Sequence, residues 1–162
     1  MRRFAVTVIG NKEGGSRWSE ETARMAYGVG RVAAEIGFVV VHGGRSGVMR
    51  EVARGCHEAG GFNLGILPGS EFEEANEFCD LVVPTAIGFA RNVITACSGD
   101  VVVALPGGQG TLQEISYAIS HGRPVLSWDS WIVHESIESA RTLDDVRDWL
   151  TLHFTRLTAA SD

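Results

Sequence analysis

The sequence predicts an α/β protein with a three-layer, Rossmann-like fold: a doubly wound parallel sheet with helices on both faces. Short apolar runs alternate with segments of helical periodicity along the chain. The runs, such as residues 38–41, are nearly continuous in β-branched and aromatic residues, as is typical of strands covered on both faces. Glycine-rich loops follow the carboxyl ends of several predicted strands, which is where sheets of this kind bind ligands.

The alternation defines each expected element. Strands are expected at residues 4–9, 37–42, 62–67, 80–84, 100–105 and 123–127. Helices are expected at residues 19–36, 47–59, 86–98, 111–121 and 143–156. The last helix has Thr142 as its expected N-cap with Asp145 three residues on, and the chain after residue 156 is expected to fray. The helix at 86–98 is expected to bury a stripe of Ile87, Ala90, Ile94 and Cys97.

Length and composition predict one domain spanning residues 1–162, with a core of ordinary size. The net charge of −6 and the lack of a basic run argue against a nucleic-acid partner. No apolar run is long enough to cross a membrane, so no membrane partner is expected. The cysteines, Cys56, Cys79 and Cys97, lack metal-ligand spacing, which predicts reduced thiols in a cytoplasmic protein and no metal site.

Lys12 is the only lysine of the chain, and this limits the possible chemistry. A Schiff-base enzyme would have to use Lys12, which lies in a polar glycine-rich loop where its amine is poorly desolvated. The loop at residues 43–47 also lacks the Lys-Ser/Thr pair of a Walker A motif. Schiff-base chemistry and P-loop ATP hydrolysis are therefore not expected.

The most informative segment is a glycine-rich loop between a strand and a helix. It consists of Pro106, Gly107, Gly108, Gln109, Gly110 and Thr111. Such a loop leaves backbone N–H groups free at a helix N-terminus, where the helix dipole favours an anion, and phosphate is the usual occupant. Glu114 lies one turn further on, where a carboxylate could perform acid–base chemistry or hold a hydroxyl group.

Two other loops are expected at the same edge of the sheet. One contains Gly10 and Asn11, and the other contains Gly43, Gly44, Arg45, Ser46 and Gly47. Arg45 and Ser46 suit a phosphate or a ribose, although the second loop could also be only a tight turn between a strand and a helix. Met49, just beyond it, is expected in the core.

Several candidate site residues also have a purely structural interpretation. Thr111 and Glu114 have the spacing of a capping box. Arg91 lies beside the predicted buried stripe and could face a ligand or extend to solvent, and Asn92 could share the site or cap a turn. His42 is expected to be a hydrogen-bonded core histidine.

Two further groups of residues are expected to be structural. The acidic residues Glu71, Glu73, Glu74 and Glu77 are expected to form a solvated loop rather than a lid. Trp128 and Trp131 are expected to pack against a helix or a subunit interface rather than on a ligand.

The chain resembles the LOG-like family, which was long labelled "possible lysine decarboxylase" and which includes cytokinin-activating phosphoribohydrolases and molybdenum cofactor carrier proteins. Residues 106–114 match the family motif P-G-G-x-G-T-x-x-E at every position. Residues 43–49 match its weaker glycine motif, and residues 8–10 resemble its first strand and turn. The resemblance covers roughly residues 4–127.

The resemblance implies cleavage of the N-glycosidic bond of nucleoside 5′-monophosphates, with Arg91 and Glu114 as catalytic residues. Arg91 would hold the ribose or base and keep Glu114 ionised. Asn92 stands where the family usually has lysine, a departure typical of the carrier branch. A non-catalytic carrier of a phosphorylated ligand, either a nucleotide monophosphate or a phosphorylated pterin, is therefore the alternative, and a regulatory nucleotide sensor ranks third. No cofactor is expected to be required, and the resemblance implies a homodimer or homotetramer.

Overall fold

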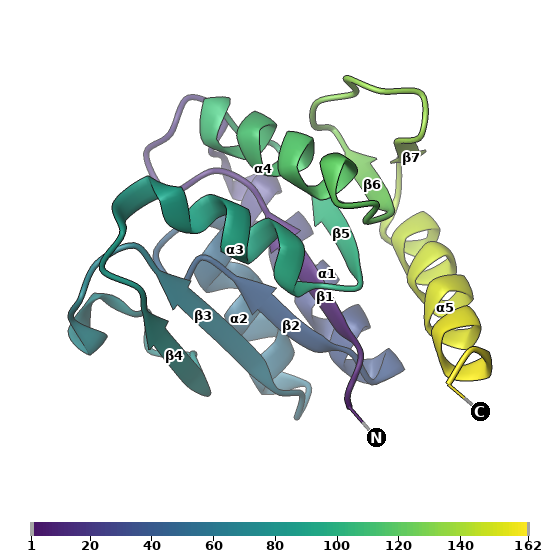
Figure 1. The fold of residues 1–162 in the computed structure, drawn as a ribbon, viewed down its shortest axis with the longest axis horizontal. Helices are drawn as coiled ribbons and strands as arrows, with labels where there is room; N and C mark the ends of the chain where they lie inside the picture. The colour runs from purple at the N-terminus through teal and green to yellow at the C-terminus, as the bar shows by residue number, and fades with distance from the viewer. Residues whose placement is uncertain (1, 162) are drawn as a thin grey trace.

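The computed structural model describes residues 2–161 and contains seven strands and five α-helices (Figure 1). The strands are β1 (Ala5–Ile9), β2 (Val39–His42), β3 (Asn63–Leu67), β4 (Leu81–Pro84), β5 (Val101–Ala104), β6 (Val125–Trp128) and β7 (Glu138–Ala140). The α-helices are α1 (Glu20–Ile36), α2 (Val48–Glu58), α3 (Arg91–Ser98), α4 (Gln109–Ser120) and α5 (Leu143–Ala159). Two short 3₁₀ helices, η1 (Phe72–Glu74) and η2 (Gly88–Ala90), flank β4.

All seven strands belong to one parallel sheet with the order β4-β3-β2-β1-β5-β6-β7. The chain builds the sheet outward from β1 in one direction and then returns to pair β5 with the other edge of β1. The order therefore reverses between β1 and β5. The loops that follow these two strands diverge there and leave a crevice for a ligand.

Helices cover both faces of the sheet, with α3 and α4 on the near face in Figure 1 and α1 and α2 behind it. The pleat sorts the side chains of β1 between these layers, because successive residues point to opposite faces. Val6 and Val8 join the core formed with α1, α2 and α5, whereas Ile9 joins the core formed with α4. The fold class predicted from the sequence is confirmed.

Helix and strand boundaries differ from the prediction at a few places. β7 was missed because its three residues, Glu138–Ala140, contain no apolar run. The predicted helix at 86–98 is α-helical only from Arg91 onward, because residues 88–90 form η2. α5 continues to Ala159, so the prediction of fraying was wrong for residues 157–159, and Asp162 lies outside the described residues. The capping box of Thr142 and Asp145 is present.

The most consequential error concerns the face that α3 buries. Ile94 is 42% exposed and Ile87 is 48% exposed, so the predicted apolar stripe does not face the core. The buried face instead carries Arg91, Asn92, Thr95 and Ala96. Sequence periodicity could not reveal this, because it assumes that the buried face of a helix is the apolar one. A helix that turns polar residues inward needs a polar site to receive them.

Candidate functional site

A pocket of about 310 Å³ lies at the carboxyl ends of β1 and β5, where the strand order reverses. Its wall combines the loops after β1, β2 and β5 with the first turns of α3 and α4. Twelve of the residues proposed from the sequence line it: Gly10, Asn11, Gly43, Arg45, Ser46, Arg91, Asn92, Gly108, Gln109, Gly110, Thr111 and Glu114.

The other four proposed residues lie behind this wall and shape it. The N–H of Gly44 donates to Nδ1 of His42 at 3.0 Å. Gly47 has a φ of 69° and lies against the backbone of the β1 loop, so a side chain there would be strained and would overlap that loop. The carbonyl oxygen of Pro106 accepts a hydrogen bond from Asn11 in the pocket wall, and that of Gly107 accepts one from Trp131, which is not part of the wall.

Sequence reasoning missed six residues of the pocket wall: Val8, Ile9, Lys12, Ser16, Met49 and Phe89. Met49 was expected in the core but is half-buried, because it lies in the first turn of α2 beside the pocket. Lys12 and Ser16 belong to the β1 loop, where Lys12 was considered only as a Schiff-base lysine and Ser16 carried no signal. Phe89 carried no signal, since an isolated aromatic residue before a helix usually belongs to the core.

Asn11 holds the three glycine-rich loops together. Its N–H donates to the carbonyl oxygen of Pro106 at 3.0 Å, and its own carbonyl oxygen accepts from the N–H of Val48 at 2.9 Å. With its amide turned so that the oxygen faces these donors, the side chain accepts from the N–H groups of Arg17 at 2.8 Å and Ser16 at 3.3 Å. One residue at the end of β1 therefore fixes the relative positions of the loops after β1, β2 and β5.

α4 begins at Gln109, two residues earlier than predicted, with Gly108 as its N-cap. Thr111 therefore lies inside the first turn and does not cap the helix with Glu114, so the capping-box interpretation is wrong. Gly108 offers no side chain to bond the first N–H groups of the helix. In any helix these groups lack partners within the helix and, with the helix dipole, form a binding site for an anion.

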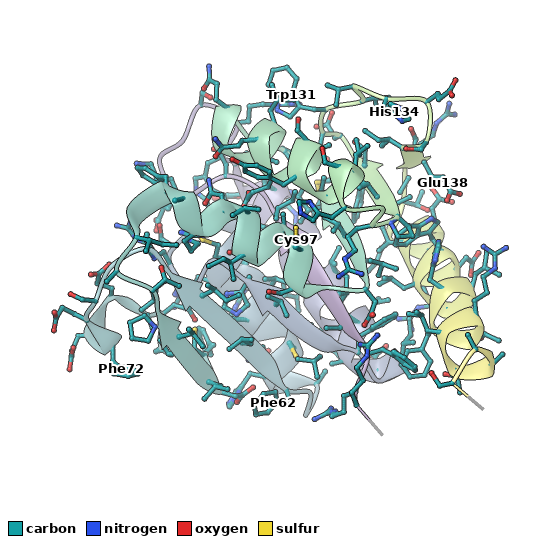
Figure 2. All side chains as sticks on the ribbon, in the orientation of Figure 1. Phe62, Phe72, Cys97, Trp131, His134 and Glu138 are labelled. Atoms are coloured by element: carbon teal, nitrogen blue, oxygen red, sulfur yellow. The ribbon has the colours of Figure 1, made fainter. Side chains whose placement is uncertain are left out.

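The loop before α4 is supported by Trp131. The Nε1–H of Trp131 donates to the carbonyl oxygen of Gly107 at 2.8 Å. Figure 2 shows Trp131 beside α4, on the long segment that connects β6 to β7. The expectation that Trp131 packs against protein rather than a ligand agrees with this contact.

Arg91 is a buried cation with an unsatisfied donor. Its side chain is at the start of α3 and the residue is only 5% exposed. Its Nε–H has no hydrogen-bond partner among the described residues, and burial lowers the pKa of its guanidinium. The absence of a side chain at Gly43 makes room for this group, because a Cβ there would overlap Nη1 of Arg91 and the sulfur of Met49. The side chain of Arg91 therefore does not extend into solvent.

Glu114 faces the same pocket from α4 and is 8% exposed. Burial raises the pKa of its carboxyl group to about 8, and the positive charge of Arg91 opposes this only in part. The expectation that Arg91 keeps Glu114 ionised is therefore wrong for this structure. Burial disfavours the charged carboxylate of Glu114, whereas the positive charge of Arg91 favours it. Burial has the larger effect, because Arg91 forms no ion pair with the carboxylate.

Asn92 shares the pocket wall and joins α3 to α4 rather than capping a turn. Its Nδ2–H donates to Oε1 of Gln113 at 3.1 Å, and the residue also lines the pocket. A lysine at this position would bring a positive charge that the neutral amide of Gln113 could not neutralise. The departure from the family pattern thus replaces a charge in the pocket wall with a neutral hydrogen bond between helices.

His42 lies behind the pocket as a neutral, hydrogen-bonded histidine. Its Nδ1 accepts from Gly44, so Nε2 carries the proton and donates to Oδ1 of Asn63 at 2.9 Å. Burial lowers its pKa to about 4. The expectation of a core histidine is confirmed, and its hydrogen bond to Gly44 connects the core to the β2 loop.

Two features of the described residues bear on metals and membranes. Within residues 2–161, no group of three or more His, Cys, Asp or Glu side chains is placed to hold a metal ion. None of the helices in this range is long and apolar enough to span a membrane.

The acidic residues near η1 are mostly solvent-exposed, and Glu77 pairs with Arg50.

The sequence of the chain is similar to those of several known proteins. Cytokinin riboside 5′-monophosphate phosphoribohydrolase LOG5 of Arabidopsis thaliana is 37% identical over 114 residues, which is 69% of this chain. This chain spans about half of that enzyme, 47% of its length. An uncharacterised protein of Archaeoglobus fulgidus is 38% identical over 145 residues, covering 90% of this chain and 93% of the relative.

The fold is shared with a protein that binds a cofactor. The molybdenum cofactor binding protein of the phototrophic bacterium Rippkaea orientalis superimposes with a TM-score of 0.87 at 27% identity, covering 94% of this chain and 98% of the other. The profile of the SLOG cluster4 family matches residues 3–151. The chain therefore belongs to the SLOG cluster4 family, a LOG-like family.

Proposed function

We propose that this protein is a nucleoside 5′-monophosphate phosphoribohydrolase that binds its substrate through the phosphate. The observation that carries the proposal is the placement of Arg91 and Glu114, two buried ionisable side chains facing one pocket without an ion pair between them. Perturbed ionisable groups in a pocket are typical of catalytic sites. The similarity to phosphoribohydrolases supports the same activity.

In the proposed complex the phosphate binds the free N–H groups at the start of α4, around Gly108 to Thr111. Lys12, Arg45 and Ser46 line the same pocket and would contribute donors to the phosphate or the ribose. Arg91 would donate to the ribose, and its unsatisfied Nε–H would gain an acceptor there.

Glu114 is proposed as the acid–base group. With a pKa of about 8, its carboxyl group carries a proton at neutral pH. The proton would pass to the base as the C1′–N bond breaks and the base takes the bonding electron pair. The carboxylate formed would stabilise positive charge on the ribose and accept a proton from the water that bonds to C1′. The products are the free base and ribose 5-phosphate.

The test is incubation of the purified protein with a panel of nucleoside 5′-monophosphates and chromatography of the released base. Glu114→Gln should lower the rate by about 10²- to 10⁴-fold, which is the usual contribution of a general acid or base. Glu73→Gln is the matched control, because Glu73 is solvent-exposed in η1 and does not line the pocket. Equal rates for wild type and Glu114→Gln would overturn the assignment.

A carrier of a phosphorylated cofactor, such as molybdenum cofactor, is the second candidate. Two observations favour it: Asn92 replaces the usual lysine, and the fold matches nearly the whole length of a molybdenum cofactor binding protein. A carrier would release no base from any nucleotide and would retain a phosphorylated pterin detectable by native mass spectrometry. Base release that depends on Glu114 would exclude a purely non-catalytic role.

We also propose that the protein assembles as a homodimer or homotetramer. Apolar side chains are exposed along β4 and around α3, among them Leu81 (51%), Val83 (42%), Ile87 (48%) and Ile94 (42%). Such a surface is typical of an interaction site. Sedimentation equilibrium tests this, with Ile94→Glu expected to shift the protein toward the monomer and a monomeric wild type contradicting the proposal.

A further inference from the structure

Phe89 is an exposed aromatic side chain in the wall of the pocket. The residue is 74% exposed, more than any other large hydrophobic residue that the structure describes, and it lies in η2, immediately before Arg91 and α3. The other strongly exposed phenylalanine, Phe72 at 62%, does not line the pocket and points away from the molecule in Figure 2. Ligand pockets are typically lined by aromatic side chains, and an exposed ring in a pocket wall offers its flat face to a ligand.

The backbone before Phe89 is held in an unusual conformation. Ala86 has a φ of 56° and Gly88 has a φ of 60°, and left-handed backbone is uncommon for alanine. Two hydrogen bonds fix this segment to the β3 loop: the N–H of Ala86 donates to Gly69 and that of Gly88 donates to Pro68, both at 2.9 Å. A strained segment persists when its surroundings hold it, and such segments concentrate at binding sites.

The pocket wall contains both polar and apolar groups. The loops and the start of α4 offer backbone amides and charged groups, whereas Phe89 and Met49 provide a flat ring and a polarizable thioether. Phe89 and Arg91 come from one continuous helical segment, η2 followed by α3. A ligand with a phosphate at one end and a planar ring at the other would use both parts of the pocket.

We infer that Phe89 is a specificity-determining residue that stacks on the planar heterocycle of the ligand, the base of a nucleoside 5′-monophosphate. This inference rests on the proposed function for the identity of the ligand. Stacking between a base and an aromatic side chain tolerates different bases, since every base has a π face. Phe89 thus favours ligands that carry a base over ribose 5-phosphate. Its loss weakens the binding of ligands with a base and not the binding of ribose 5-phosphate.

The test compares AMP with ribose 5-phosphate by calorimetric titration, in a Glu114→Gln background that slows turnover. Phe89→Ala should weaken AMP binding by about 5- to 150-fold, the range for loss of one stacked base, and should leave ribose 5-phosphate binding unchanged. Phe89→Trp should retain AMP affinity because it keeps an aromatic face, whereas Phe89→Leu should lose most of it. Phe72→Ala is the control for removal of an exposed phenylalanine and should change neither affinity.

The outcomes separate the inference from the proposed function. If both ligands bind but Phe89→Ala weakens neither, or weakens both equally, the stacking role is wrong and the phosphate site stands. If Phe89→Leu binds AMP as tightly as the parent does, the ring has no special role and the inference fails. If neither ligand binds the parent protein or wild type, the proposed function fails and the inference falls with it. If Phe89→Ala changes the sedimentation coefficient and weakens both ligands together, Phe89 belongs to a subunit interface instead.

Discussion

The guanidinium of Arg91 and the carboxyl group of Glu114 face one pocket from neighbouring helices without forming an ion pair. Both side chains are buried, and the Nε–H of Arg91 has no partner in the part of the chain described. Leaving buried polar groups unpaired lowers stability, so the arrangement is unfavourable in the absence of a ligand. Groups of this kind are typical of a site built to bind a charged or polar molecule.

Replacement of Arg91 by methionine should stabilise the unliganded protein while abolishing ligand binding. Methionine keeps much of the apolar stem and removes the unsatisfied donor, which costs about 1–3 kcal/mol when buried. Urea denaturation should therefore show a higher free energy of unfolding for Arg91→Met, and calorimetry should show loss of AMP binding.

Arg123 provides the matched control for this prediction. Its Nε–H is also buried without a partner, but its Nη2–H donates to the carbonyl oxygen of Cys97 at 3.1 Å, near the end of α3. Arg123→Met should therefore lower stability and leave the pocket unaffected. If Arg91→Met destabilised the protein as much as Arg123→Met does, Arg91 would have a structural role and the contrast would disappear.

Glu114 should make the wild-type protein less stable as the pH rises. Its pKa is about 8 in the folded protein against 4.5 as the ordinary value, so the folded state binds the proton more tightly. The contribution of this group to the stability of the folded state is fully present below pH 4.5 and is lost as the pH rises through 8. Between pH 6.5 and 8 we expect Glu114 to lower the free energy of unfolding by roughly 1–2 kcal/mol in wild type, because the slope of about 1.4 kcal/mol per pH unit halves by pH 8, and we expect no such loss in Glu114→Gln. Urea denaturation at a series of pH values measures the free energy of unfolding of wild type and Glu114→Gln. An equal dependence on pH in the two proteins would contradict the raised pKa of Glu114.

His42 should make the protein less stable as the pH falls, which is the opposite of the effect of Glu114. Its pKa falls from 6.5 to about 4 on burial, so the unfolded chain takes up a proton first and stability is lost as the pH falls below 6.5. Glu114 gains stability over the same range, so the two effects should cancel in wild type between about pH 4.5 and 6.5. Glu114→Gln removes the compensation and should lose roughly 2 kcal/mol from His42 over this range, and the lowered pKa of His153 acts in the same direction. NMR titration of the His42 ring in Glu114→Gln tests whether His42 causes this loss of stability. A ring that titrates near its ordinary pKa would rule out His42 as the cause.

Trp131 should tune ligand affinity through the loop before α4 rather than through direct contact. Trp131→Phe keeps an aromatic ring but loses the hydrogen bond to the carbonyl oxygen of Gly107. A hydrogen bond of this type contributes about 0.5–1.5 kcal/mol, so the Kd for ribose 5-phosphate should rise by about 2- to 12-fold. Ile132→Ala, in a neighbouring residue that is 61% exposed, should leave the Kd unchanged. An unchanged Kd in Trp131→Phe would show that the loop holds its shape without this bond.

The sequence alone predicted the parallel α/β fold and most of the pocket wall. The alternation of apolar strands and amphipathic helices is a local property, and in a parallel sheet it brings the loops after the strands to one edge. The glycine loop at 106–110 was recognisable for the same reason, because its lack of side chains and its place before a helix are both visible in the chain. Twelve of the sixteen proposed site residues lie in the pocket wall as a consequence.

Only the tertiary structure decided how the polar groups of the site are used. The apolar pattern of α3 pointed Ile94 inward, but the pocket takes Arg91 and Asn92 on the buried face and leaves Ile94 in solvent. The protonation of Glu114 depends on its burial and on the position of Arg91, 23 residues earlier in the chain, and no local pattern encodes either. Periodicity reports which side chains avoid water, whereas the charge state of a site depends on distances between residues remote in sequence.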